Sequence, residues 1–255
     1  MYNQMKKLSR NLYFKLLTVC FAFVLFLAIL FLFPSREHSL KPALLQHSDS
    51  AETKNEVQQR TIPRAGFKPA VTTLFWVGEP SNAENAYIPN DKSAWDSFWQ
   101  EHYGGVDDPN GRCDFYPCTF IPKENPFYVA LPYTDYSADD NFKKSVEQIP
   151  WYMPLPIGES YLKNRWVEIE YNGRVCFGQW EDTGPNEDDD FGYVFGNSTI
   201  PKNTFGARAG LDVSPALWTC LGLAENEVTY WKFINQTDVP NGPWKRIVTT
   251  RSVSH

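Results

Sequence analysis

The sequence predicts a mostly β domain with one or two small helices, preceded by one transmembrane helix. Segments rich in β-branched and aromatic residues are short and bounded by Gly, Pro or Asn, which is typical of strands joined by tight turns. Two of these segments flank Asn172-Gly173, the strongest short signal for a β-hairpin. Upstream, residues 16–33 form an uncharged apolar run that is just long enough to cross a bilayer as a helix.

The first 66 residues are predicted to anchor the domain in the membrane and to hold it outside the cytoplasm. Residues 1–15 are basic and should stay in the cytoplasm, which makes residues 16–33 a signal-anchor helix. That run ends in large residues where signal cleavage needs small ones, so we expect an uncleaved anchor; cleavage would make the protein secreted. Residues 34–66 contain few large apolar groups and predict a flexible linker. The folded domain, residues 67–236, and a C-terminal extension, residues 237–255, would then be periplasmic or extracellular.

Charge is distributed unevenly along the chain. The net charge is −6, and residues 1–33 carry four basic groups and no acid, so the remainder carries −10. An acidic domain argues against nucleic acid as a partner, because phosphate binding needs clusters of Lys and Arg. Aromatic residues make up 16% of the chain. Most are expected in the core, although aromatic rings along a groove would stack on sugars.

Cysteine positions indicate an oxidising compartment. Cys20 lies in the apolar run, and the other four, Cys113, Cys118, Cys176 and Cys220, fit two disulfides. Cys113 and Cys118 would close a small loop, whereas Cys176 and Cys220 have apolar neighbours and could pair or be free and buried. A metal site is disfavoured because His102 is the only histidine inside the predicted domain, and no cofactor is expected.

The first half of the domain predicts two strands and a short helix. Residues 71–77 form a β-rich strand that ends at Gly78-Glu79-Pro80. Residues 93–99 are typical of a short helix after an Asp or Ser cap. His102 then falls in a loop, and residues 127–131 form the next strand, which Pro132 ends. Residues 137–164 are irregular.

The second half carries the organising elements. Strands are expected at residues 166–171 and 175–180, on either side of the Asn-Gly turn, with an acidic loop at 186–190. Such a loop could hold Ca²⁺, but it lacks EF-hand spacing, which favours a solvated loop. Later elements are a short extended segment at 210–213, a helix from Pro215 to Leu221 capped by Ser214 and ended by Gly222, and strands at 228–234 and 246–250.

Two aspartates stand in conspicuous motifs. Asp182 lies in Trp-Glu-Asp-Thr-Gly-Pro, and Asp212 lies in Leu-Asp-Val-Ser-Pro-Ala, just before the predicted helix and its Leu221-Gly222 end. This order of strands, Asn-Gly turn and motifs, over about a quarter of the chain, resembles the six-stranded double-psi β-barrel of the RlpA-like superfamily. That group includes rare lipoprotein A, expansins, barwin-like proteins and family 45 glycoside hydrolases. The likeness is strongest to secreted bacterial members of no established activity that carry a segment like residues 125–133.

The resemblance implies roles for these residues. In the hydrolases the Asp of the Leu-Asp-x-Ser type of motif is the general acid, a role that carries over to Asp212. Asp182 corresponds to the signature Asp of rare lipoprotein A. The chain departs from the pattern in two places: it lacks the His that precedes this Asp in expansins, and it lacks the Tyr-Trp-Asp-Cys-Cys start that supplies the hydrolase base. Glu79, in Phe-Trp-Val-Gly-Glu, is the nearest substitute.

Glycosidic cleavage usually needs two carboxylates, although a lytic transglycosylase needs only one. The acid works only if apolar walls or a like charge raise its pKa. We therefore predict Asp212, Asp182 and Glu79 as catalytic residues. The residues predicted to bind substrate around them are Trp76, Tyr133, Asp135, Trp180 and Glu181. A structural alternative stays open, since Asp212 could cap the helix and Asp182 could merely form a turn.

Function is therefore expected to concern the cell envelope. The first hypothesis is an extracytoplasmic protein that cleaves a polysaccharide or peptidoglycan by carboxylate general acid catalysis. The alternatives are a non-catalytic, expansin-like glycan-binding module and a structural or protein-interaction domain. The expected partners are a glycan polymer, of peptidoglycan, cellulose-like or chitin-like type, and the membrane through the N-terminal helix. We expect Asp182 and Asp212 to approach each other across one groove.

Overall fold

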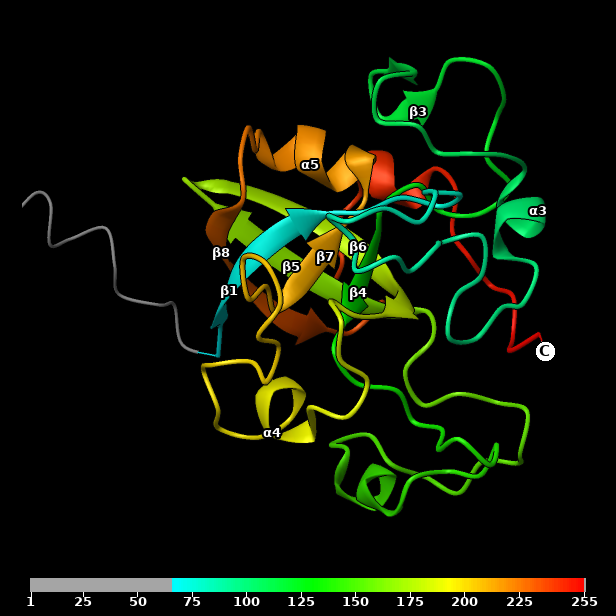
Figure 1. The fold of residues 1–255 in the computed structure, drawn as a ribbon, viewed down its shortest axis with the longest axis vertical. Helices are drawn as coiled ribbons and strands as arrows, with labels where there is room; N and C mark the ends of the chain where they lie inside the picture. The colour runs from blue at the N-terminus through cyan, green and yellow to red at the C-terminus, as the bar shows by residue number, and fades with distance from the viewer. Residues whose placement is uncertain (1–65, 255) are drawn as a thin grey trace, which may run out of the picture. The chain divides into compact units, whose positions relative to one another are not determined.

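Six strands close into a mixed barrel in the computed structural model, which describes residues 66–254 (Figure 1). Around the barrel they follow the order β1-β7-β4-β6-β5-β8. The pairs β1–β7 and β4–β6 are parallel, and the other neighbours are antiparallel. This confirms the mostly β, six-stranded prediction. The strands are β1 (Lys68–Leu74), β4 (Tyr128–Leu131), β5 (Arg165–Tyr171), β6 (Arg174–Thr183), β7 (Leu211–Val213) and β8 (Glu227–Ile234).

The Asn-Gly turn forms the predicted hairpin between β5 and β6. Tyr171 pairs with Arg174, so the turn contains only Asn172 and Gly173. Both turn residues have positive φ, 48° and 77°, which is the requirement of a type I′ turn. The tight turn sets the register of the whole hairpin, because the period of side chains along a strand is two.

Alternation along the strands separates the barrel interior from an outer face. Val129 and Leu131 of β4, like Leu211 and Val213 of β7, are fully buried in the main hydrophobic cluster. Ala130, between the first pair, instead belongs to a second cluster outside the barrel. Two polar side chains inside the barrel satisfy each other, since the hydroxyls of Thr72 and Thr229 are 2.8 Å apart.

Helix α5 (Pro215–Leu221) agrees with its prediction in both bounds and caps. The Ser214 hydroxyl accepts a hydrogen bond from the Leu217 N–H, and Gly222 ends the helix with φ of 71°. Two features were not predicted: helix α4 (Phe191–Val194), whose cap is Asp190, the last residue of the acidic loop, and the small hairpin of β2 (Arg112–Cys113) and β3 (Tyr116–Pro117). Two 3₁₀ helices complete the structure, η1 (Lys144–Gln148) and η2 (Pro243–Lys245).

The helix predicted at residues 93–99 instead begins at its end, as α3 (Trp99–Tyr103). Asp96 is the reason, because its carboxylate accepts hydrogen bonds from the Phe98 N–H and contacts Nδ1 of His102 at 2.7 Å. These bonds hold the preceding residues in turns and bridges. His102 therefore lies in α3 and not in a loop.

Residues 237–254 pack on the barrel without adding the strand predicted at 246–250. Side chains take the backbone hydrogen bonds that a strand would use: Gln179 Oε1 accepts from the Thr249 N–H at 2.9 Å, and the Asn125 N–H donates to the Thr249 hydroxyl. Trp244 packs against Phe127 and Phe177. The C-terminal extension is thus part of the folded unit.

The predicted cytoplasmic segment, anchor helix and nearly all of the linker, residues 1–65, lie outside the described residues. Among residues 66–254, no helix has both the length and the apolar character that a membrane span requires.

Two disulfides are present, as expected, and Cys176 and Cys220 are paired and not free. Cys113–Cys118 closes the small β2–β3 hairpin, and Cys176–Cys220 ties β6 to helix α5 across the core. The second therefore closes a much longer loop, with a sequence separation of 44 against 5.

Loop length predicts how much each disulfide stabilises the domain. Replacing Cys176 and Cys220 by Ala should lower the free energy of unfolding by about 4 kcal/mol, against about 2 kcal/mol for Cys113 and Cys118, since a longer closed loop restricts the unfolded chain more. Denaturant unfolding of both double variants measures this difference. Equal losses, or a larger loss for the short loop, would contradict it.

Candidate active site

Strand register brings Asp182 and Asp212 onto the same face of the sheet. Ala130 of β4 pairs with Asp182 of β6 on one side and with Asp212 of β7 on the other. Residues paired in register point to the same face, which here is the outer face that Ala130 shares with the second hydrophobic cluster. The two aspartates are therefore two strand spacings apart, about 10 Å between Cα atoms.

A β-bulge is what turns Asp182 to this face. Val129 pairs with Trp180, but the next residue, Ala130, pairs with Asp182, so Glu181 is an extra residue in β6. Without it, strict alternation would have sent Asp182 into the barrel interior. Bulges commonly re-aim a side chain beside an active site, and this one places a carboxylate opposite Asp212.

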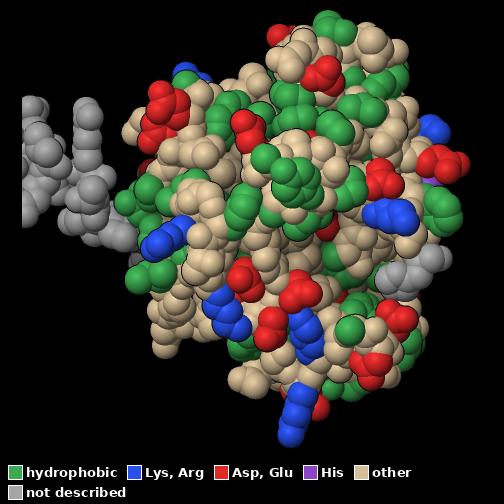
Figure 2. All heavy atoms as spheres, viewed as in Figure 1, with side chains coloured by type: hydrophobic (Ala, Val, Ile, Leu, Met, Phe, Trp, Pro, Cys, Tyr) green, Lys and Arg blue, Asp and Glu red, His purple; other side chains and the backbone are tan. Residues whose placement is uncertain are grey.

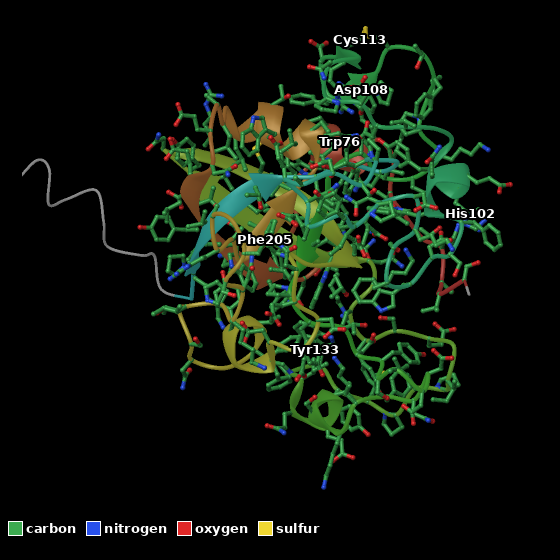
Figure 3. All side chains as sticks on the ribbon, viewed as in Figure 1. Trp76, His102, Asp108, Cys113, Tyr133 and Phe205 are labelled. Atoms are coloured by element: carbon green, nitrogen blue, oxygen red, sulfur yellow. A yellow bond between two sulfur atoms is a disulfide. The ribbon has the colours of Figure 1, made fainter. Side chains whose placement is uncertain are left out.

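The three predicted catalytic acids line one groove of about 540 Å³. Asp182 and Asp212 come from the barrel, and Glu79 comes from the loop after β1. Residues 203–209 close another side, and Figure 3 shows Phe205 of this segment in front of the barrel strands. Figure 2 shows a hollow near the centre of this face, with acidic side chains around it.

Each aspartate has one oxygen held and one left for a ligand. Oδ1 of Asp182 accepts hydrogen bonds from the backbone N–H groups of Ala94 and Thr183, at 2.8 and 2.7 Å. Oδ1 of Asp212 accepts from the Thr73 hydroxyl. Among the described residues, no hydrogen bond uses Oδ2 of either side chain. The Gly184 backbone passes so close that a Cβ there would lie 3.5 Å from Oδ2 of Asp212.

These contacts decide between the structural alternatives for the two residues. Asp212 does not cap helix α5, because the Ser214 hydroxyl does so. Asp182 does hold the turn that follows it, through the Thr183 N–H, but this occupies only one of its oxygens. Among the described residues, no hydrogen bond uses the second oxygen, and Asp182 lines the groove.

The groove raises the pKa of its carboxyl groups. Burial raises the pKa of Asp212 to about 7, with smaller contributions from the charges of Glu79 and Asp182. Burial likewise raises the pKa of Asp182 to about 7, opposed by its two backbone donors. Burial also raises the pKa of Glu79, opposed by asparagine side chains, among them Asn90, which donates at 2.9 Å. Carboxyl groups of this kind can hold and release a proton near neutral pH.

The structure does not bring the predicted substrate-binding residues into this groove. Asp135 is buried, and it accepts hydrogen bonds from Trp95, Ser160 and Tyr161. Glu181 is buried in an ion pair with Lys163, with Nζ and Oε2 2.6 Å apart. Both carboxylates are therefore bound to buried partners and not to a ligand site in the groove.

The aromatic residues predicted as groove walls also lie elsewhere. Trp180 and Tyr133 are fully buried in the core, where Trp180 stacks on Phe233. Trp76 is half-buried, but it does not line the groove. Figure 3 shows Trp76 and Tyr133 far apart, on opposite sides of Phe205.

Several groove residues were missed by the sequence analysis. Thr73 fixes Asp212, and Asn90 fixes Glu79. The only sequence signal for them was strand alternation at Thr73 and the turn-like composition around residues 85–90.

Among residues 66–254, no group of three or more His, Cys, Asp or Glu is arranged to hold a metal ion. In the acidic loop, Asp190 accepts hydrogen bonds from the Tyr193 and Lys202 N–H groups.

No protein-family model matches the chain, and no curated protein matches it either.

The buried ion pair of Lys163 and Glu181 predicts that removing one partner destabilises the fold more than replacing both partners by apolar residues. Lys163→Met leaves Glu181 buried without its cation and should lower the free energy of unfolding by roughly 3–5 kcal/mol. The loss should be larger at pH 8 than at pH 5, because burial has already raised the pKa of Glu181 to about 7 and loss of the ammonium raises it further. Urea unfolding at both pH values measures this. The control is Lys163→Met with Glu181→Leu, which should lose less than the single variant.

Asp212 should make the folded state less stable as pH rises. Its folded pKa of about 7 exceeds the ordinary value of 3.8, so the folded form binds the extra proton between pH 4 and 7 and stability falls across that window. Asp212→Asn keeps an acceptor for Thr73 and removes the titration. It should match the wild type at pH 4 and exceed it at pH 8 by roughly 4 kcal/mol, since each of the roughly three pKa units corresponds to about 1.4 kcal/mol.

Thermal unfolding from pH 4 to 8 tests this, with Glu84→Gln as control, because Glu84 is an exposed carboxylate at the same groove. A pH-independent difference between wild type and Asp212→Asn would contradict the assignment.

Proposed function

We propose that the chain is a member of the RlpA-like double-psi β-barrel superfamily and cleaves a cell-envelope glycan by carboxylate acid catalysis. The observation that carries this is the pair of aspartates on one outer face, each with one oxygen held, one oxygen free and a pKa raised to about 7. A closed six-stranded mixed barrel is compatible with this superfamily. Glycosidic cleavage requires such groups on either side of one bond.

The surroundings of the two aspartates favour different roles. Asp212 feels the charges of Glu79 and Asp182, both of which keep its proton on. Asp182 feels the ammonium of Lys163 and two backbone donors, which favour its ionised form. The pair shares its protons and titrates as a unit. In the singly protonated pair, Asp212 donates the proton to the leaving oxygen and Asp182 acts as base.

Spacing of the pair supports attack by water. Two strand spacings place the Cα atoms about 10 Å apart. In inverting enzymes the two carboxyl groups are roughly 6.5–9.5 Å apart, which leaves room for a water molecule on the far side of the sugar. The Cα spacing is compatible with this arrangement, and the proposed reaction inverts the anomeric carbon. Asp182 takes a proton from water, the water oxygen bonds to that carbon, and the leaving sugar oxygen takes the proton of Asp212.

The disulfides support an extracytoplasmic place for this reaction. Both pairs join cysteines of the folded domain, and such bonds persist in oxidising compartments. A glycan polymer of the envelope is the partner available there.

The test uses full-length protein in mild detergent, incubated with peptidoglycan, cellulose and chitin, with soluble products identified by mass spectrometry. Wild type should release products, with a bell-shaped pH profile of kcat/KM: it falls at low pH, where Asp182 gains a proton and can no longer act as base, and at high pH, where Asp212 loses its proton. Asp212→Asn should lower kcat about 10²–10⁴-fold, the usual contribution of an acid or base. Asp182→Asn should have a similar effect, and Glu79→Gln should lower the upper limit of the pH profile by removing a like charge.

Glu147→Gln is the matched control and should keep the activity, because Glu147 is an exposed carboxylate that does not line the groove. Retention on a polymer without products would favour the non-catalytic glycan-binding alternative. Neither retention nor products would leave a structural or interaction domain.

A further inference from the structure

A second hollow lies where strand β5 begins and strand β8 ends. Its volume is about 440 Å³, which is within the range of pockets that take small ligands, and it shares no lining residue with the groove. In the order of strands around the barrel, the pair β5–β8 is opposite the pair β4–β7. This strand-end hollow is therefore a separate feature of the molecule.

One buried hydrogen-bond donor of the strand-end hollow has no acceptor. Trp166 lines the hollow and pairs with Ile234, which lines it too, so their side chains lie on the same face of the sheet. Trp166 is only 2% exposed, and its indole Nε1 is buried without a hydrogen-bond partner among residues 66–254. Five other tryptophans of the described domain donate this N–H to an acceptor. A buried donor without an acceptor is costly, so this one points to a group that the protein itself does not supply.

A buried acceptor in the same hollow is also unpaired. The side chain of Asn164, another lining residue, donates from Nδ2 to the Arg251 carbonyl at 3.1 Å, and this bond identifies its other atom as the oxygen. That oxygen, Oδ1, is buried and has no partner in the described part of the chain. A hydroxyl group can both donate and accept, so the neighbouring hydroxyls of a sugar satisfy the Asn164 oxygen and the Trp166 N–H together.

Charge in the strand-end hollow comes from Arg165, Lys232 and Asp238. Lys232 pairs with Glu168 at 3.1 Å, and Asp238 accepts a hydrogen bond from the Asn235 side chain at the same distance. Arg165 contacts a carbonyl and an aromatic ring, and within the described domain it has no acidic partner. Its positive charge is therefore the one that a ligand can neutralise.

The guanidinium of Arg165 is held in place with its end free. Nε donates to the Tyr161 carbonyl at 3.0 Å, and the group lies 4.8 Å from the centre of the Trp151 ring. Within residues 66–254, neither terminal nitrogen of this guanidinium donates a hydrogen bond. A guanidinium fixed in this way presents two parallel N–H groups, which match the two oxygens of a carboxylate.

We infer that the strand-end hollow binds an acidic sugar residue of a glycan chain. The sugar carboxylate accepts two hydrogen bonds from Arg165, one hydroxyl donates to Oδ1 of Asn164, and another accepts the indole N–H of Trp166. These three residues are consecutive at the start of β5, so their Cα atoms lie within about 7 Å along the strand. The site goes beyond the proposed function, because it is separate from the groove and needs no catalysis there.

Binding of matched trisaccharides tests the inference. The 1,4-linked trimer of galacturonic acid and its methyl ester, which keeps the hydroxyls and removes the charge, are titrated calorimetrically at pH 7 into the full-length protein in mild detergent. The acid trimer should bind about tenfold more tightly than the ester, because hydrogen bonds between ionised groups are stronger than neutral ones. Added salt should reduce this preference.

Matched variants locate the effect in the strand-end hollow. Arg165→Gln should lower the affinity for the acid trimer to that for the ester and leave binding of the ester unchanged. Arg174→Gln is the control, because it removes an exposed arginine that does not line the hollow, and it should keep the preference. Trp166→Phe keeps a ring and removes the N–H, so it should weaken binding of both trimers. Arg165→Gln, at an exposed position, decides the matter if Trp166→Phe does not fold.

Asp212→Asn separates this site from the groove. It should bind both trimers as the wild type does, because Asp212 lines the groove and not the strand-end hollow. No binding of the acid trimer, equal affinities for the two trimers in wild type, a preference that survives Arg165→Gln, or trimer binding that changes with Asp212→Asn would each overturn the inference. Cleavage of glycans by the wild type is an independent readout, so failure of the proposed catalysis would leave the trimer result standing.

Discussion

The extra residue in β6 is the constraint on which the site depends. Glu181 interrupts the pairing with β4 and shifts every later residue of β6 by one, so that Asp182 reaches the outer face opposite Asp212. The side chain of the bulge residue Glu181 forms an ion pair with Lys163, and both side chains are almost completely buried. A buried pair of this kind adds little net stability compared with apolar residues, but loss of one partner is expensive. Its value here is positional, since it fixes which carboxylate faces the groove.

Local signals in the sequence were sufficient for much of the barrel. Asn172-Gly173 can adopt the two positive φ values of a tight hairpin, and Ser214-Pro215 combines a cap with a residue that suits a first helical turn. These signals act within a few residues, so the structure agrees with them. The errors occur where distant side chains take over the backbone. The contact of the Asp96 carboxylate with His102 makes helix α3 begin later than predicted. The Gln179 side chain accepts the hydrogen bond of the Thr249 N–H, which a neighbouring strand would otherwise accept. Neither contact leaves a trace in local composition.

For the site too, local motifs predicted some features, and long-range contacts determined the rest. Asp182 and Asp212 were nominated by motifs, and their meeting in one groove follows from a register that no local pattern contains. The choice of groove walls had less to support it, because an aromatic ring beside an aspartate in sequence looks the same whether it faces a ligand or the core. Trp180 precedes the bulge and therefore points inward, while Asp182, two residues later, points outward. Strict alternation would have put both on one face.

The three carboxyl groups of the groove lower the stability of the fold. Three carboxyl groups with raised pKa values in one groove cost folding free energy whenever they ionise. The structure offsets this by fixing one oxygen of each aspartate, through Thr73 or through backbone N–H groups, and by tying β6 to α5 with a disulfide. Full satisfaction of both oxygens would have stabilised the ionised forms and returned their pKa values toward the ordinary range. The oxygens without a hydrogen bond therefore keep the raised pKa values on which the proposed proton transfer depends.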